Sequence, residues 1–334
     1  MASSFLFAAV PLAALLARSP ALDVARIDDL VMGNANGSGK DNRNVGRIAV
    51  LLAGLPVSVP ANTVNRLCGS SLHAAMIASS AVETGYSVVV IAAGVESMTR
   101  SLWVLPKPAK SFPAMEVTAV STTLGWRLVN PAIPGEFVIS NGAITEMLAD
   151  RFGIDCERQD AFALRSHQRA DAGCITAGNA SPLNDGAPAV LVGGESAAAI
   201  GQEPLARIAG RGVYADEPRW FGYALVGAAE RALKQAGLTW SDIGAVELNE
   251  AFAAQSLTCL DTWDIDPELV NQRGGPIAIG HPLGASGGRV LATLVNVLRK
   301  TGSRYGVAAI CIGIDIGLAV VLENLNTDTG QTAA

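Results

Sequence analysis

The sequence contains few residues of the kinds that hold metals or bind nucleic acids. Of its 334 residues, three are histidine and five are cysteine, and no two cysteines form a Cys-x-x-Cys pair. Charged residues make up 16% of the chain, the formal net charge is −6, and no Lys/Arg stripe stands out. We therefore expect no metal site and no nucleic-acid partner. An odd number of cysteines without framework spacing also favours a reducing, cytoplasmic compartment.

Long hydrophobic runs are also missing. Residues 5–17 are apolar, but the run is too short to span a membrane and Pro11 interrupts it. The positively charged start of a secretory signal is absent, since the first Lys or Arg is Arg18. We expect a buried helix here and no membrane partner.

Small and apolar residues are abundant, because half of the chain is apolar and 35 residues are glycine. A chain of this length can hold two domains, and the composition favours a globular α/β protein. One pattern occurs twice, over residues 69–94 and 284–313: a glycine turn, a helix ending in Thr-Gly, an apolar strand and a further glycine. We interpret it as an internal duplication of two βα halves with largely buried strands.

Further elements are predicted between and around the repeats. Residues 99–140 are rich in proline and irregular, and residues 146–172 have helical spacing of charged residues. The other predicted elements are strands at 27–33, 190–192 and 243–248 and helices at 8–18, 45–53 and 219–237.

One histidine stands in a dense glycine frame near the C-terminus. Residues 274–288 run Gly-Gly-Pro-Ile-Ala-Ile-Gly-His-Pro-Leu-Gly-Ala-Ser-Gly-Gly, with His281 in the middle. Glycines allow positive φ and close approach, so the frame is suited to presenting a general base or an oxyanion donor. The alternative is a structural histidine that caps a turn. The other two, His73 and His167, have polar neighbours, which predicts a solvated face.

Two cysteines stand at turn-prone positions. Cys68 precedes Gly69-Ser70-Ser71 and a predicted helix, and Cys311 ends an apolar strand. The positive end of the helix dipole is expected to lower the pKa of the Cys68 thiol and to favour a nucleophilic thiolate. Cys311 is a candidate second acid or base. Either cysteine is alternatively a small buried hydrophobe, but their occurrence together with His281 favours thiol-based acyl chemistry.

A polar pair, Asn249 and Glu250, ends a predicted strand ahead of an apolar helix. In one interpretation the pair caps that helix. In the other, Asn249 holds a water molecule or an oxyanion.

Taken together, these segments resemble the thiolase family of acyl-CoA C-acyltransferases. The loop at 33–44 and the segment at 125–131 most resemble the branch that cleaves 3-oxoadipyl-CoA in aromatic-acid catabolism. The family motifs recur in order at residues 64–71, 94–98, 176–181, 249–252, 280–282 and 311–313.

The resemblance implies a five-layered α/β/α/β/α fold made of two βαβαβαββ halves, the first of them incomplete. It places the N-terminal half at residues 1–98 and 181–202, a shortened loop domain at 99–180 and the C-terminal half at 203–334. It also implies a homodimer or homotetramer.

The resemblance further implies catalytic roles. Cys68 would take the acyl group as a thioester, His281 would deprotonate Cys68, and Cys311 would move the proton at the α-carbon of the substrate. The backbone N–H groups of Cys68 and Gly313 would form one oxyanion hole. His281 and a water held by Asn249 would form the other.

The substrate contacts implied by the resemblance are Ser181, Ala251 and Phe252. Acyl-CoA and CoA are the expected partners. Coenzyme A would be a co-substrate, and no permanently bound cofactor is expected.

The chain departs from the family pattern at several places. The opening strand of the family is expected to be missing, and the loop domain is expected to be short between Gly173 and Cys174. After Gly313, the residues Ile314-Asp315-Ile316 replace glycines and are expected to hinder the thioester or repel an enolate.

Two hypotheses follow from these departures: a working thiolase with a reduced CoA site, or a thiolase-like protein with impaired CoA binding and little or no turnover. A third class, the chain-elongating ketosynthases of related fold, would require two histidines with one cysteine. The Cys–His–Cys set argues against it.

Overall fold

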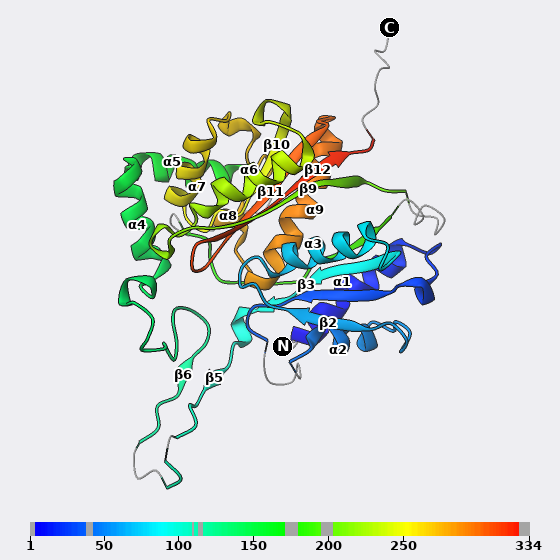
Figure 1. Cartoon of the computed structure of the whole chain (residues 1–334), viewed down its shortest axis with the longest axis horizontal. Helices are drawn as coiled ribbons and strands as arrows, with labels where there is room; N and C mark the ends of the chain where they lie inside the picture. The colour runs from blue at the N-terminus through cyan, green and yellow to red at the C-terminus, as the bar shows by residue number, and fades with distance from the viewer. Residues whose placement is uncertain are drawn as a thin grey trace.

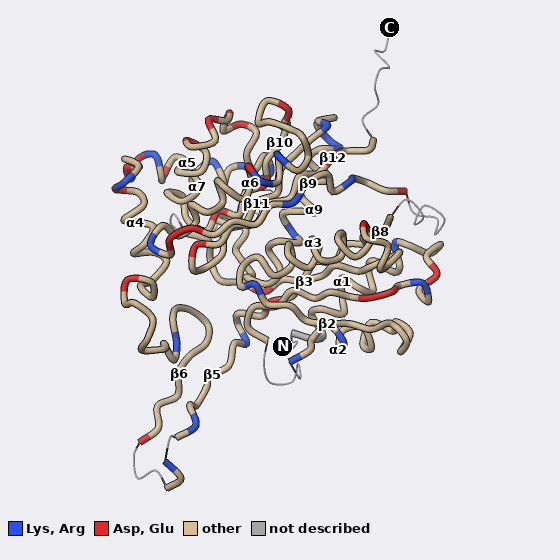
Figure 2. Tube along the Cα trace, in the orientation of Figure 1, with Lys and Arg blue, Asp and Glu red and all other residues tan. Residues whose placement is uncertain are grey.

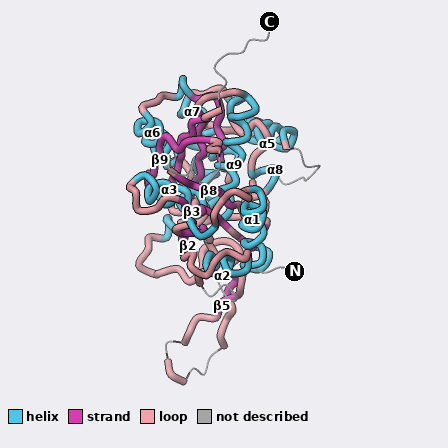
Figure 3. Tube along the Cα trace, turned by 90° about the vertical axis from the view of Figure 1, so that its right-hand side faces the viewer, coloured by secondary structure: helices cyan, strands magenta, loops and turns pink. Residues whose placement is uncertain are grey.

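The structure, a computed structural model, describes residues 4–37, 43–108, 110–112, 116–170, 180–194 and 203–326. These residues form five alternating layers of helices and sheets (Figures 1 and 3). The predicted fold class is therefore confirmed. Within the described ranges, no helix is long and apolar enough to cross a membrane.

The first sheet has the strand order β2-β1-β3-β8. Strands β1, β2 and β3 are parallel, and β8 pairs with β3 in the antiparallel direction. Helices α1 (Ser4–Arg18) and α2 (Val45–Leu52) cover its outer face. The strands are β1 (Asp29–Gly33), β2 (Ala61–Val64), β3 (Val89–Gly94) and β8 (Ala189–Gly193).

The second sheet has the order β10-β11-β12-β9. Strands β10 and β11 are parallel, β12 is antiparallel to β11, and β9 is antiparallel to β12. Helices α6 (Ala224–Ala236) and α7 (Ala253–Trp263) cover its outer face. The strands are β9 (Ala206–Ala215), β10 (Ile243–Leu248), β11 (Tyr305–Ile312) and β12 (Ile316–Asn324).

The predicted duplication is visible in the two sheets. In each half, a helix of the middle layer leads into a buried strand that pairs with an antiparallel neighbour, as β3 does with β8 and β11 with β12. Strands β3 and β11 are almost entirely buried because both faces of each sheet are covered by helices. The exact segment boundaries of the halves stay a prediction.

The middle layer consists of α3 (Ser70–Glu83) and α9 (Leu283–Thr301), which lie between the two sheets (Figure 1). Small residues let the two helices approach closely at their N-terminal ends. A Cβ added at Gly287 would lie 2.3 Å from the backbone nitrogen of Leu72, so only glycine fits there. Part of the glycine frame around His281 therefore serves helix packing.

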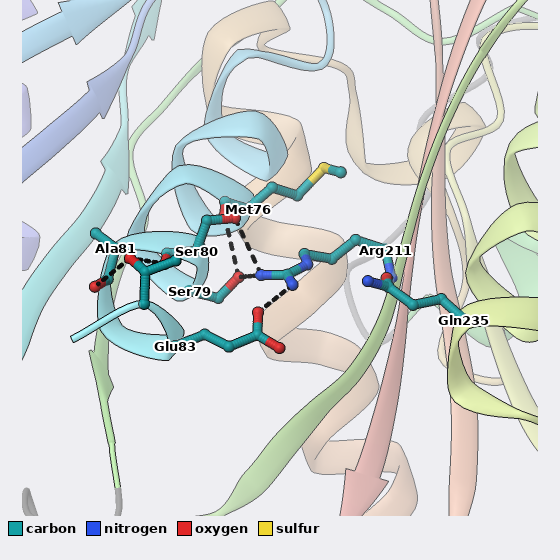
Figure 4. Close-up of polar contacts among 8 residues, drawn as sticks. Met76, Ser79, Ser80, Ala81, Glu83, Arg211 and Gln235 are labelled. Carbon is teal, nitrogen blue, oxygen red and sulfur yellow. Dashed lines mark hydrogen bonds and ion pairs between the residues drawn. The ribbon is translucent and has the colours of Figure 1, made fainter. Parts of the chain in front are cut away.

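The two halves are also joined by Arg211 of β9 (Figure 4). Its guanidinium donates to Ser79 Oγ at 2.8 Å and to Ser80 Oγ at 3.1 Å, and it pairs with Glu83, all on α3. Its backbone N–H donates to Gln235 Oε1 at 2.6 Å. One side chain thus connects the second sheet to the middle layer.

Some predicted elements differ from the structure. The helical stretch at 146–172 is two helices, α4 (Asn141–Phe152) and α5 (Cys156–Arg169), because Gly153 takes φ 65° and ends the first. The helix predicted from residue 219 begins only at Ala224. Strands β9 and β12 were not predicted.

The region at 99–140 is largely irregular, as predicted, and projects from the body as an arm (Figure 1). Two short strands, β5 (Trp103–Val104) and β6 (Val120–Ser121), pair within it. A second short pair joins β4 (Glu96–Ser97) to β7 (Asp185–Gly186). Lys, Arg, Asp and Glu are scattered over the molecule rather than gathered in a stripe (Figure 2).

Asp315, in the turn between β11 and β12, fastens the start of α6. Its Oδ1 accepts the N–H groups of Gly222 at 2.8 Å and Ala224 at 3.1 Å, while its Oδ2 is buried without a hydrogen-bond partner among the described residues. Burial raises the pKa of Asp315 to about 7, although the same N–H groups oppose the shift. The negative charge of Asp216 adds to the increase in this pKa.

We predict that Asp315→Asn makes the stability of the protein less dependent on pH. The folded state holds the Asp315 proton more tightly than the unfolded chain, whose carboxyl has a pKa near 3.8. The ionised side chain therefore lowers stability progressively from about pH 4 to pH 7, and the full penalty is present above pH 7. Asparagine keeps the Oδ1 acceptor without the charge.

At pH 8 the variant should therefore unfold at a higher urea concentration than the parent, with a free energy of unfolding about 1–3 kcal/mol larger. At pH 4 the two proteins should unfold at nearly the same urea concentration. The measurement is urea unfolding of both proteins across this range. A parent–variant difference that does not change with pH contradicts the prediction.

Candidate functional site

Two of the predicted catalytic residues lie at the carboxyl ends of neighbouring strands. Asn249 follows β10, and Cys311 is the penultimate residue of β11. The N–H of Asn249 donates to the Ala309 carbonyl of β11 at 2.9 Å. Because β10 and β11 are parallel, their carboxyl ends lie at the same edge of the sheet.

The other two side chains, Cys68 and His281, enter from the middle layer. Cys68 precedes α3 and His281 precedes α9. The first turns of these helices are in direct contact, since the N–H of Gly288 donates to Ser71 Oγ at 2.8 Å across a sequence separation of 217 residues. The helix contact brings the two halves of the predicted site together.

Cys68 lies in a tight turn next to Gly313. The preceding residue, Leu67, has φ 46°, an uncommon conformation for a branched side chain. Ser70 holds this turn, because its Oγ accepts from the N–H of Arg66 at 2.9 Å and donates to the Leu67 carbonyl at 2.6 Å. The N–H of Gly313 is directed at the Cys68 sulfur.

The expected lowering of the Cys68 pKa is wrong. Part of the residue surface is accessible, but protein surrounds the thiol, and this burial raises its pKa to about 12. The charge of Glu96 raises the pKa further, while the N–H groups of Gly313 and of Cys68 itself lower it only in part. Desolvation outweighs the helix dipole, so the predicted nucleophile rests as a thiol, which would need a base.

His281 is held in one tautomer by Ser286. The single proton of the Ser286 hydroxyl is donated to the Pro282 carbonyl at 3.0 Å. With the proton assigned to that bond, the oxygen accepts from His281 Nδ1 at 2.6 Å, and this assignment, which satisfies both contacts, leaves Nε2 without a proton. Burial lowers the pKa of His281 to about 3, and the charge of Arg289 lowers it further. At neutral pH the imidazole is thus an uncharged base.

Asn249 faces the free nitrogen of this imidazole. Its Nδ2 lies 3.5 Å from His281 Nε2, and its Oδ1 is buried without a hydrogen-bond partner among the described residues. The capping interpretation of the pair is wrong, because α7 begins at Ala253 and Phe252 occupies its N-cap position. Glu250 instead accepts from Asn271 Nδ2 at 2.6 Å.

Cys311 is buried, and its thiol is close enough to Cys68 to feel that residue's charge. Its sulfur lies 3.9 Å from Gln255 Oε1. Burial raises the pKa of the Cys311 thiol, and the charges of Cys68 and Cys259 would raise it further. The two site thiols are close enough for the ionisation of one to oppose the ionisation of the other.

The three residues predicted to contact the substrate lie in two segments that contact each other, and one of these segments also contacts His281. The N–H of Ser181 donates to the Ala251 carbonyl at 3.3 Å, and the adjacent Pro182 carbonyl accepts from the N–H of His281 at 3.0 Å. The Phe252 ring lies edge-on to another phenylalanine ring at 6.2 Å. Their contact with CoA stays a prediction.

The residues that replace glycines after Gly313 lie in the turn between β11 and β12. The Asp315 carboxylate accepts N–H groups at the start of α6, and its negative charge also raises the pKa of the Cys311 thiol, so repulsion of an enolate stays a prediction. Ile314 has φ 68°, a strained value for a β-branched residue, and is 46% exposed. The junction of Gly173 and Cys174 lies outside the described residues.

The site contains partners that the sequence alone did not single out. Glu96 accepts the N–H groups of Ala35 at 2.9 Å and Gly284 at 2.8 Å, which ties the first sheet to the start of α9. Ser286 stands five residues after His281 inside the glycine frame. This position is the only sequence signal that could have indicated a role for Ser286. His73 and His167 are half-buried rather than on a solvated face.

A metal site is not found within the described ranges, where no group of three or more His, Cys, Asp or Glu side chains is placed to hold an ion.

We predict that Ser286→Ala changes the tautomer of His281. Without the acceptor at Nδ1, the proton is free to move to Nε2, and the rate of Cys68 alkylation by iodoacetamide should fall about 10-fold to 100-fold. Imidazole ¹⁵N shifts report the tautomer directly, and with three histidines in the chain the signals can be assigned by single replacements. Ser286→Thr, which keeps the hydroxyl, should resemble the parent. An unchanged tautomer in the alanine variant would falsify the assignment.

Comparison with known proteins agrees with this geometry. The family model described as Thiolase, N-terminal domain matches residues 3–174, and that described as Thiolase, C-terminal domain matches residues 202–324. The chain is 40% identical to the beta-ketoadipyl-CoA thiolase of Acinetobacter baylyi over 372 aligned positions, covering 95% of this chain and 92% of that protein.

A second relative, the 3-oxoadipyl-CoA/3-oxo-5,6-dehydrosuberyl-CoA thiolase of Escherichia coli K12, is also 40% identical and covers 95% of this chain and 93% of its own length. Among solved structures, human mitochondrial 3-ketoacyl-CoA thiolase superposes with a TM-score of 0.87 at 28% identity, over 96% of this chain and 93% of that one. The chain therefore belongs to the thiolase family of acyltransferases.

Proposed function

We propose that this thiolase cleaves 3-oxoadipyl-CoA with CoA, giving acetyl-CoA and succinyl-CoA through a thioester on Cys68. The substrate class is supported by the printed names of two relatives that are 40% identical over most of the chain. The observation that carries the catalytic assignment is the His281–Ser286 hydrogen bond, which leaves a bare, uncharged Nε2 beside Asn249.

The first step forms the acyl-enzyme. His281 takes the Cys68 proton as the sulfur attacks the C3 carbonyl, and the oxyanion is stabilised by the N–H groups of Cys68 and Gly313. Coupling the proton transfer to the attack suits a thiol whose pKa is raised to about 12, because a free thiolate is scarce at neutral pH.

The second step breaks the C2–C3 bond. Its electron pair remains on the acetyl-CoA fragment as an enolate, whose oxygen is stabilised by His281, now protonated, and by Asn249. Cys311 donates its proton to the α-carbon and becomes a thiolate. Its raised pKa makes the thiolate a strong base, which is suited to taking the proton of the incoming CoA thiol.

In the third step, the CoA sulfur attacks the Cys68 thioester. The new C–S bond forms, the Cys68 sulfur leaves with the electron pair, and the His281 proton returns to it. Coenzyme A is consumed as a co-substrate, and the enzyme regains its starting protonation. Ser181, Ala251 and Phe252 are proposed to contact the CoA chain.

We predict thiolysis of 3-oxoadipyl-CoA by the purified chain, with acetoacetyl-CoA as the comparison substrate. The loss of the 3-oxoacyl-CoA enolate absorbance measures the rate, and mass spectrometry of Cys68 measures the acyl-enzyme. Cys68→Ser should abolish both signals, because a neutral hydroxyl is a far weaker nucleophile at this position.

Surface Cys156→Ser is the matched control and should retain both signals, since Cys156 is an exposed free cysteine. An unmodified Cys68 in the parent after incubation with acyl-CoA would favour the alternative of a thiolase-like protein without turnover. A preference for acetoacetyl-CoA would keep the thiolase assignment and reject the 3-oxoadipyl assignment.

We also propose that the chain works as a homodimer or homotetramer in a reducing compartment such as the cytoplasm. The arm carries large apolar side chains on its surface, including Trp103 at 70% and Phe112 at 93% exposure, which is typical of a contact surface. The free thiols Cys68, Cys259 and Cys311 suit a reducing compartment.

We predict that light scattering after size exclusion gives at least twice the mass of the 34.3 kDa chain. Replacing Trp103 and Phe112 with serine should lower the measured mass or weaken the association, because it removes apolar contact area. A monomeric parent at micromolar concentration contradicts the prediction.

A further inference from the structure

Behind the His281 turn lies a hollow of about 240 Å³ whose polar residues take no part in the proposed chemistry. Glu247 of β10, Arg289 of α9 and Pro276, which opens α8 (Pro276–Ile279), contribute to its walls. Glu247 is 4% exposed. Oε1 of Glu247 and Nη2 of Arg289 are both buried without a hydrogen-bond partner within the described part of the chain.

Arg289 connects this hollow to the peptide that carries His281. Its Nη1 donates to the Gly280 carbonyl at 2.7 Å. That carbonyl and the N–H of His281 belong to the same planar peptide group, and the N–H donates to the Pro182 carbonyl at 3.0 Å. The peptide is thus held at both ends, which fixes its rotation and the direction in which the His281 side chain leaves the backbone.

The peptide needs such support because Gly280 has an unusual conformation. It has φ 85° and ψ 168°, which L side chains rarely adopt, and it follows the short helix α8. A Cβ at this position would lie 2.5 Å from the Asn184 side chain. Neither a preferred backbone geometry nor a long helix fixes the plane of the peptide, so the Arg289 contact has a strong influence on it.

Charged groups of both signs lie around the turn and the hollow: Arg289 on α9, Arg273 in the wall of the hollow, Glu247 at β10, Glu250 after β10 and Glu96 on β4. Burial raises the pKa of Glu247 to about 8 and lowers that of Arg289 to about 10. The ionised forms of Glu247 and Glu250 favour the charged form of Arg289. Arg289 therefore remains a cation at neutral pH, and its charge disfavours protonation of His281.

We propose that Arg289 is a positioning residue that sets the direction and the uncharged state of His281. The inference rests on the role proposed above for His281 as the base. Arg289 lies behind the turn and forms no part of the proposed CoA path, so its loss should lower kcat while changing KM little.

The test compares Arg289→Ala and Arg289→Lys with the parent. We expect Arg289→Ala to lose about 10-fold to 100-fold in kcat for thiolysis and a similar factor in the rate of Cys68 alkylation by iodoacetamide. The ¹⁵N titration of His281 should give a higher pKa in this variant. Arg289→Lys keeps the charge but not the directed N–H donor, so its His281 pKa should stay low while its kcat is intermediate.

Chemical rescue makes the test specific to the guanidinium group. The hollow adjoins the position that the Arg289 head group occupies, so millimolar guanidinium should restore kcat in Arg289→Ala several-fold, and the same concentration of urea or NaCl should not. Guanidinium should leave the parent unchanged. A merely structural loss of packing would not respond to these ions differently.

Arg211→Ala is the matched control (Figure 4). It also removes a largely buried arginine, but one whose contacts are with Ser79, Ser80 and Glu83 on α3. The Arg211→Ala variant should unfold at a lower urea concentration than the parent. Its kcat and its His281 pKa should equal those of the parent, and guanidinium should not change its kcat. If Arg289→Ala does not fold, Arg289→Lys carries the test through its kcat and its His281 pKa.

An Arg289→Ala protein that folds with parent-like kcat and Cys68 alkylation overturns the proposal, as does an Arg289→Lys protein indistinguishable from the parent. The alkylation rate separates this inference from the proposed function. If the parent protein does not catalyse thiolysis but its Cys68 alkylation still depends on Arg289, the proposed function is rejected and the positioning role is retained.

Discussion

The candidate site depends on the contact between the N-terminal parts of α3 and α9. Cys68 precedes one of these helices and His281 the other, so this contact sets how close the two segments lie. The absence of a Cβ at Gly287 allows the backbone at Leu72 to approach, and the Ser71 hydroxyl ties the two turns together. The proposed catalytic pair is therefore brought together by helix packing in the core rather than by a flexible loop.

Burial, not the helix dipole, sets the protonation state of this pair. It raises the pKa of Cys68 to about 12 and lowers that of His281 to about 3, so both groups rest uncharged. An uncharged pair avoids placing two ions in a poorly solvated site. It also defers charge separation to the moment of attack, when the N–H of Gly313 and the Asn249 amide are placed to receive the negative charge.

Local sequence patterns predicted the duplicated layers and the candidate catalytic residues, because glycine turns, apolar strands and short motifs are local signals. The pKa of Cys68 could not be predicted in the same way, since it depends on protein that surrounds the thiol from distant segments. Strand β9 was missed because its burial comes from pairing with β12, which no local alternation reveals. Ser286 was visible only as one small residue among glycines.

The glycine frame illustrates how one sequence feature can combine two physical requirements. Gly287 serves the approach of two helices, whereas Gly280 permits the turn that presents His281. Freedom at Gly280 allows the turn but does not specify it, so a directed contact must select the peptide orientation. A planar guanidinium can hold the Gly280 carbonyl with one directed N–H, which a lysine ammonium on a flexible stem cannot do with the same directionality. The frame and Arg289 are thus complementary: glycine makes the conformation accessible, and the guanidinium makes it unique.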